Sequence, residues 1–178
     1  MTTRTTIRPI EQLGAPVLRQ MAAPVEDIDD PAVAEVIESM LATLAATEGV
    51  GIAAPQIGES LRIVVVASRP TARYPSAPSI EPTVMINPEF EPLSNEFEKG
   101  WEGCLSIPGI RALVPRYRRI AVGYRDRRNQ RQNVEFDDFV ARVFQHEFDH
   151  LDGKVYLDRV ESNRDIISEQ EYQNLIGG

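Results

Sequence analysis

Cysteine, histidine and tryptophan are scarce in this sequence. The 178 residues include one cysteine, two histidines and one tryptophan. A single cysteine cannot form a disulfide within the chain, which is typical of proteins in a reducing compartment. We therefore expect a cytoplasmic protein whose thiol, at Cys104, is either free for chemistry or simply buried.

Basic residues and long apolar runs are also few. The 19 lysines and arginines against 27 acidic residues give a net charge of −8, which disfavours general attraction to phosphate backbones. The first ten residues lack the apolar run of a secretory signal, and no window approaches the roughly 18 apolar residues of a membrane span. We expect no membrane partner and no direct nucleic-acid specificity. Length and composition predict a single globular domain over residues 1–178.

Two segments show helical patterns. The first begins at an Asp-Pro pair at residues 30–31, carries apolar residues at helical spacing and is expected to end near Gly49. The second is expected to begin with a capping side chain at Asp137 or Asp138 and to stop at Gly153.

Strand patterns lie between these two helices. We expect strands at residues 61–67 and 83–86, the latter closed by the Asn-Pro pair at 87–88, and a hairpin over residues 120–136. The proline-rich residues 68–82 predict a surface loop. Strands grouped between two helices favour an α+β fold over repeated βαβ units.

The second helix carries the sequence His-Glu-Phe-Asp-His, an HExxH motif, at residues 146–150. Residues four apart lie about 40° apart around a helix, so His146 and His150 can bind one metal ion. Glu147 projects roughly 100° from His146, where it can contact a metal-bound water as a base. A catalytic metal of this kind normally has three protein ligands. The third is either an acidic residue or the thiolate of Cys104.

Two further segments are candidates for the same site. Cys104 lies in Trp-Glu-Gly-Cys-Leu-Ser, where a strand is expected to bend, and a bend can direct a side chain to a metal and leave backbone N–H groups available. The segment GVGIAAPQ, residues 49–56, has glycines that allow close approach of another chain. Taken alone, a free cysteine is more often an inert buried residue, and glycines in this position more often form a helix end and a turn. Gln56 is a candidate hydrogen-bond donor.

Together, GVGIAAPQ, EGCLS and QHEFDH, in this order, resemble the three signature motifs of the peptide deformylases. The resemblance covers residues 49–150. It implies an α+β fold in which strands wrap around a central HExxH helix. It also implies an enzyme that hydrolyses the formyl group of N-terminal formylmethionine on nascent polypeptides, releasing formate.

The same resemblance implies a role for each site residue. Glu147 would be the general acid and base, and the Gln56 side chain would form the oxyanion hole with the Leu105 N–H. One divalent ion is implied, Fe2+ in many members and Zn2+, Ni2+ or Co2+ in the same site, with the ligands Cys104, His146 and His150. The implied substrate contacts are Gly49, Val50, Gly51, Glu102, Leu105, Val143 and His146.

Two other functions are open on the sequence alone. A zinc endopeptidase also uses HExxH and would cleave an unformylated peptide. A binding module that keeps the motifs without catalysis would release no formate.

The C-terminal segment, residues 161–178, is acidic. Four acidic residues and one arginine give it a net charge of −3, so it is not expected to dock on the RNA-rich ribosome. Any transient ribosome contact would use another surface. We expect the segment to pack on the body or to fray, with Ile166, Ile167 and Leu175 making what apolar contact it has.

Overall fold

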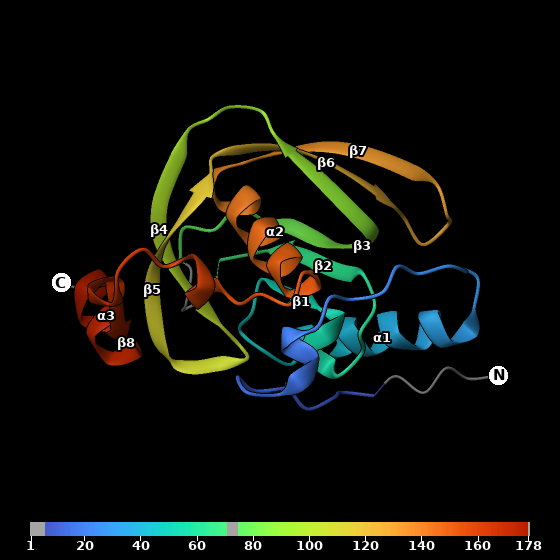
Figure 1. Ribbon diagram of the computed structural model, residues 1–178, viewed down its shortest axis with the longest axis horizontal. Helices are drawn as coiled ribbons and strands as arrows, with labels where there is room; N and C mark the ends of the chain where they lie inside the picture. The colour runs from blue at the N-terminus through green and yellow to red at the C-terminus, as the bar shows by residue number, and fades with distance from the viewer. Residues whose placement is uncertain (1–5, 71–74, 178) are drawn as a thin grey trace.

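Helix α2 lies at the centre of the fold, and strands surround it in two sheets (Figure 1). The structure is a computed structural model that describes residues 6–70 and 75–177. One sheet has the strand order β1-β2-β3-β6-β7 and the other the order β4-β5-β8. The elements are η1 (Pro16–Arg19), α1 (Pro31–Ala45), β1 (Gly51–Ala53), η2 (Ala54–Ile57), β2 (Ile63–Ser68), β3 (Ile80–Pro92), β4 (Phe97–Cys104), β5 (Ile107–Tyr117), β6 (Arg119–Arg125), β7 (Arg131–Asp137), α2 (Asp138–Leu151), η3 (Tyr156–Arg159), η4 (Asn163–Asp165), β8 (Ile166–Ser168) and α3 (Glu169–Gly177).

The position of strand β2 between two hydrophobic cores explains why its sequence is an uninterrupted run of β-branched residues. Val64 and Val66 belong to the hydrophobic core around α2, whereas Ile63 and Val65 belong to the core under α1. Successive side chains of a strand point to opposite faces, so a strand covered on both sides is apolar throughout. The predicted α+β fold, with strands wrapped around the HExxH helix, is confirmed.

Helix α1 begins where the sequence predicts and ends earlier. The Asp30 side chain accepts a hydrogen bond of 2.8 Å from the Ala32 N–H, as expected of an N-cap. The helix stops at Ala45, because Thr47 turns back and its hydroxyl donates to the Leu44 carbonyl at 2.9 Å. The predicted end near Gly49 is thus four residues too late.

Helix α2 is confirmed, but the predicted side-chain cap at its start is wrong. Asp137 makes no capping hydrogen bond and instead accepts one of 2.8 Å from Arg119. Asp138 accepts one of 3.0 Å from Arg118. At the other end, Gly153 has the left-handed φ of 68° that follows a helix stop.

The strand predicted at residues 83–86 does not end at the Asn-Pro pair, and β3 continues through it. Asn87 adopts a φ of 49°, and the pairing register shifts between Ile86 and Glu89. The Asn87 side chain bonds the Val25 backbone N–H at 2.8 Å and carbonyl at 2.9 Å. This bulge lets β3 pass from β2 to β6 without breaking.

The loop predicted over residues 68–82 is shorter than expected. Ser68 ends β2, and β3 already begins at Ile80. Residues 71–74 of the loop lie outside the described residues. The hairpin predicted over residues 120–136 is confirmed as β6 and β7.

The C-terminal segment packs on the body. Strand β8 pairs with β5, and α3 follows beside β4 and β5 (Figure 1). Ile166 and Ile167 are half-buried, and Tyr172 is buried. Leu175 is 61% exposed, so the predicted apolar contact there is wrong. In the described part of the chain, no helix is long and apolar enough to cross a membrane.

Candidate active site

Cys104 ends strand β4 at the turn into β5. It pairs with Ile107, so Leu105 and Ser106 form the turn, and the β4–β5 register shifts between Glu102 and Cys104. Such a bulge changes the direction in which side chains point. The bend predicted in this segment is confirmed, and the Cys104 side chain lies inside the fold, 3% exposed.

Helix α2 brings two imidazoles to the thiol. The ligand atoms of Cys104, His146 and His150 all lie within 4.8 Å of one another, and all three residues are buried. The Cys104 Sγ lies 3.4 Å from the His150 Nε2. Metal–sulfur and metal–nitrogen bonds of about 2.3 and 2.0 Å place the ligands of one tetrahedral ion roughly 3 to 4 Å apart. One thiolate and two imidazoles at this separation fit a borderline-soft divalent ion.

The charges around Cys104 favour its thiolate. Burial would raise the pKa of the thiol, but His150 and His146 together hold it well below its usual range. The thiolate is the form that binds a metal ion.

Glu102 orients one of these imidazoles. Its carboxylate lies 2.8 Å from the His146 Nδ1, which leaves the Nε2 of that ring for a metal ion. Arg116 donates two hydrogen bonds to the same carboxylate, at 2.9 and 3.0 Å, and Arg142 donates a third at 3.0 Å. Burial would raise the pKa of Glu102, yet Arg116 and His146 hold it well below its usual range. The Glu102 carboxylate is therefore occupied by protein partners.

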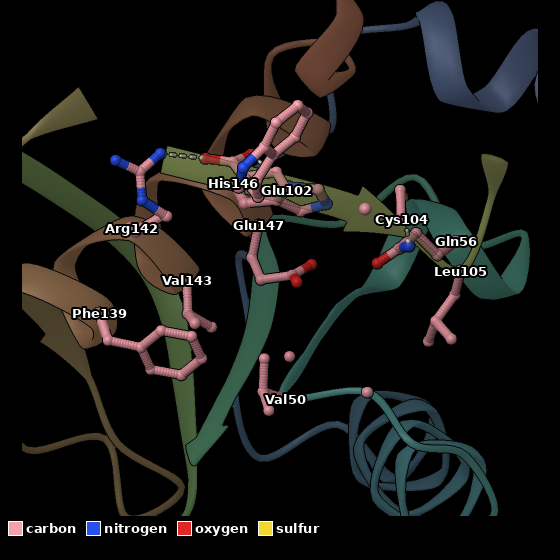
Figure 2. A pocket seen from close by; sticks show the side chains of 14 residues that line it. Val50, Gln56, Glu102, Cys104, Leu105, Phe139, Arg142, Val143, His146 and Glu147 are labelled. Atoms are coloured by element: carbon pink, nitrogen blue, oxygen red, sulfur yellow. Dashed lines mark hydrogen bonds and ion pairs between the residues drawn. The ribbon is translucent and has the colours of Figure 1, made fainter. Parts of the chain in front are cut away.

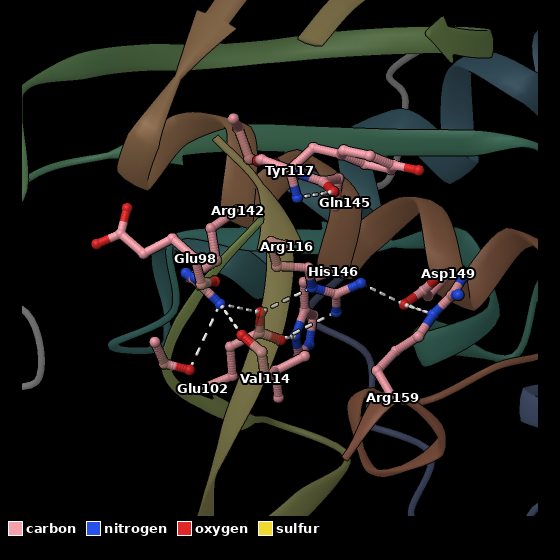
Figure 3. A network of polar contacts seen from close by, with 12 residues as sticks. Glu98, Glu102, Val114, Arg116, Tyr117, Arg142, Gln145, His146, Asp149 and Arg159 are labelled. Atoms are coloured by element: carbon pink, nitrogen blue, oxygen red, sulfur yellow. Dashed lines mark hydrogen bonds and ion pairs between the residues drawn. The ribbon is translucent and has the colours of Figure 1, made fainter. Parts of the chain in front are cut away.

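The ion-pair network continues beyond Arg116 (Figure 3). Arg116 is 4% exposed and donates to Asp149 at 2.6 Å, and Arg159 donates to the other oxygen of Asp149 at 2.7 Å. The sequence alone did not predict this network. One signal was present, because Arg116 falls in phase with Ala112 and Val114, the inward-facing positions of β5.

Glu147 is a buried carboxylate with a vacant hydrogen-bonding oxygen. The residue is 4% exposed, and its Oε2 has no partner among the described residues. Burial raises the pKa of Glu147 to about 7. A Cβ at Gly51 would lie 2.6 Å from the Glu147 Oε1, so any larger residue at this position would displace the carboxylate.

Gln56 presents its amide N–H₂ to the same site. It lies in η2, 1% exposed, and its Oε1 accepts a hydrogen bond of 2.9 Å from the Ala53 N–H. Its Nε2 donates to the Ser106 hydroxyl at 3.2 Å and lies 3.5 Å from the Cys104 Sγ. The segment 49–56 thus forms a short strand and a 3₁₀ turn that place a donor beside the thiol.

One cavity collects nearly all of the predicted site residues (Figure 2). Val143 lies on one side of it and Gln56 and Leu105 lie on the other, with Glu147 pointing in between. Fully buried His150 is the one predicted residue that does not line it. The residues lining the cavity are Gly49, Val50, Gly51, Gln56, Trp101, Glu102, Gly103, Cys104, Leu105, Phe139, Arg142, Val143, His146 and Glu147.

Sequence analysis did not assign Trp101, Phe139 and Arg142 to this cavity. Phe139 and Arg142 lie four and one residues before Val143 on α2, and Phe139 therefore shares its helix face. Trp101 lies on β4 near the other wall residues from that strand. The spacing on α2 was a usable signal, whereas the position of Trp101 depends on how β4 packs.

Comparisons with known proteins identify the family of the chain. The family model described as "Polypeptide deformylase" matches residues 7–165. The chain is 56% identical to a peptide deformylase of Nostoc sp. over 94% of each chain, and 49% identical to one of Bordetella pertussis over 86% of this chain and 88% of the other. The crystal structure of a class I type b peptide deformylase from Acinetobacter baumannii, bound to Met-Ala-Ser, superposes with a TM-score of 0.84 at 39% identity, covering 88% of this chain and 99% of that chain. The chain belongs to the polypeptide deformylase family and is an enzyme that removes the N-terminal formyl group from newly synthesised polypeptides.

Proposed function

We propose that Cys104, His146 and His150 hold one divalent metal ion and that Glu147 works beside it. Enzymes of this family depend on a metal, and the three buried ligand atoms lie within 4.8 Å of one another. This clustering is the observation that carries the proposal. Fe2+ is the ion we propose, and Zn2+, Ni2+ or Co2+ suits the same ligands. Such an ion would supply the Lewis acidity that polarises the formyl carbonyl and lowers the pKa of water.

In this proposal Glu147 moves the proton. Its Oε2, which has no partner among the described residues, accepts a proton from the attacking water. The same carboxyl then returns that proton to the amine as formate leaves. Burial raises the pKa of Glu147, and a raised pKa suits a carboxyl that first accepts a proton and then returns it.

Gln56 and the Leu105 N–H are proposed to stabilise the oxyanion that forms during attack. The Gln56 amide accepts a bond from Ala53, so its orientation is set before the substrate binds. Replacing Gln56 with alanine is expected to lower kcat roughly tenfold, with a smaller change in KM, since the donor acts mainly on developing charge. Steady-state assays of formate release check this, with Gln130→Ala in the exposed β6–β7 turn as control. A change confined to KM would contradict the role.

The cavity walls are proposed to receive the methionine side chain. Val50, Leu105 and Val143 are apolar, and the structure adds Phe139 and Trp101 to this wall. Glu102 also lines the cavity, but its occupied carboxylate suits it to orient His146 rather than to bind substrate.

Strand β1 is proposed to bind the backbone of the peptide. It lies at the edge of the five-stranded sheet, where an extended chain can add as a further strand. Gly51 begins this strand, Gly49 lies two residues before it, and both line the cavity. Their small size leaves room for the substrate to approach.

Enlarging Val143 tests the position of the pocket. Val143→Trp is expected to raise KM for a formyl-methionyl peptide by at least about tenfold, because the indole fills the space of the methionine side chain. The exposed residue Arg128, changed to tryptophan, serves as control. Unchanged kinetics in a folded Val143→Trp variant would place the pocket elsewhere.

The partners and compartment follow from this substrate. N-formylmethionyl nascent polypeptides are made in the cytoplasm of a bacterial cell, so we place the enzyme there, as one domain over residues 1–178. The family assignment favours this reading over a zinc endopeptidase or a non-catalytic binding module. Formate release at a normal rate would exclude both alternatives.

Ribosome contact is proposed to avoid the acidic C-terminal segment. Truncation after Ser162 is expected to leave ribosome affinity unchanged in a cosedimentation assay. The truncated protein is expected to be less stable, because β8 and α3 cover β5 and its buried Arg111. A large, salt-sensitive loss of ribosome affinity would show that the segment docks after all.

A further inference from the structure

The C-terminal helix α3 is fastened to the body by a buried arginine. Arg111, on β5, is 0% exposed and donates two hydrogen bonds to Glu169, at 2.7 and 3.1 Å. Its guanidinium also lies 4.5 Å from the centre of the Tyr172 ring. A planar guanidinium that is paired on its edge and stacked on its face fixes both partners in place. The first turn of α3 is therefore held in a defined position.

Tyr172 connects helix α3 to the active site. The residue is 7% exposed, and its ring centroid lies 5.9 Å from that of Trp101, tilted by 59°. Trp101 is half-buried and lines the catalytic cavity together with Cys104 and Glu147. One aromatic contact thus links the C-terminal helix to the wall of the site.

A second cavity adjoins that wall. It shares Trp101, Phe139 and Arg142 with the catalytic cavity, and Tyr172 and Ile176 from α3 complete it. Tyr172 is the aromatic support of Trp101 on α3.

We propose that Tyr172 is a positioning residue of the active site: by holding the Trp101 ring, it makes the C-terminal helix part of the wall that receives the first side chain of the substrate. This inference rests on the substrate pocket proposed above. It assigns the acidic C-terminal segment a role in substrate binding in place of one in ribosome docking.

The test is the variant Tyr172→Ala. We expect KM for a formyl-methionyl peptide to rise roughly two- to tenfold, the range given by loss of one aromatic contact. The value of kcat is expected to stay nearly constant, because Tyr172 does not line the cavity that contains Glu147 and Cys104. Trp101 is the single tryptophan of the chain, so its fluorescence emission reports directly on the surroundings of this wall. In the variant the emission maximum should shift to longer wavelength. Titration with the peptide Met-Ala-Ser should change this emission less than in the wild type.

Two variants separate positioning from general stability. Tyr172→Phe keeps the ring and should restore both KM and emission. Leu175→Ala, on the same helix but 61% exposed, should behave as wild type in both. If Tyr172→Ala does not fold, Tyr172→Leu keeps apolar bulk without the aromatic ring and takes its place.

The outcomes distinguish this inference from the pocket on which it rests. A folded Tyr172→Ala variant with shifted emission but wild-type KM overturns the inference, provided that Val143→Trp raises KM in the same assay. If neither variant changes KM, the pocket itself is misplaced. A lowered kcat with unchanged KM also overturns the inference.

Discussion

Replacing Glu147 with glutamine is expected to lower kcat by roughly 10²- to 10⁴-fold, the contribution typical of a general acid–base catalyst. Glutamine has nearly the same shape but cannot accept a proton from water. The metal content of the variant should equal that of the wild type, because the ligands Cys104, His146 and His150 are unchanged. Stopped assays of formate release and metal analysis on the same sample check both statements.

Glu135→Gln is the matched control for this variant. Glu135 lies on β7 with its side chain 62% exposed, so its replacement should leave turnover unchanged. Retained turnover in Glu147→Gln would mean that the base lies elsewhere. Lost metal would mean that Glu147 supports the ligands as well as the chemistry.

Removing the arginine at the centre of the buried network is expected to destabilise the fold strongly. Arg116→Met leaves the carboxylates of Glu102 and Asp149 buried without their main partner. Breaking a buried ion pair from one side costs roughly 3–5 kcal/mol, since the remaining charge stays out of water. Urea unfolding followed by circular dichroism measures this loss of free energy.

Arg118 offers a control two residues along the chain. It also pairs with two carboxylates, of Glu98 and Asp138, but its side chain is 47% exposed. Arg118→Met should therefore unfold close to the wild-type urea concentration, because water replaces the lost partner. Equal losses for Arg116→Met and Arg118→Met would contradict a special role for the buried network.

Arg116→Met should also weaken metal binding by roughly ten- to a hundredfold, because Glu102 no longer holds His146 in place.

Much of the site was predictable because its geometry is local. The four-residue spacing of His146 and His150 on one helix determines that both rings face the same way. The glycine and proline residues around Cys104 indicate a bend, and the β4–β5 turn is found there. The spacing alone left the third metal ligand open, and the family resemblance then implied Cys104.

The remaining features depend on contacts between distant segments. The role of Glu102 is set by Arg116 and Arg142, which lie 14 and 40 residues away in sequence. The sequence around Asn87 predicts the end of a strand, but the residue instead forms a bulge within β3 that is stabilised by hydrogen bonds to the Val25 backbone. The position of α3 depends on the buried Arg111, whose partner Glu169 lies 58 residues away in the sequence. No local pattern identifies that partner. Local sequence patterns carry no information on such pairings.

The most direct test is one measurement on an anaerobically purified sample of the wild-type chain. Formate release from a formyl-methionyl peptide is assayed, and the bound metal is quantified in the same sample. We expect close to one divalent metal ion per chain, with Fe2+ the main species, and formate release that a chelator abolishes and added metal restores. Formate release by the metal-free protein, or a fully metal-loaded protein that releases none, would contradict it.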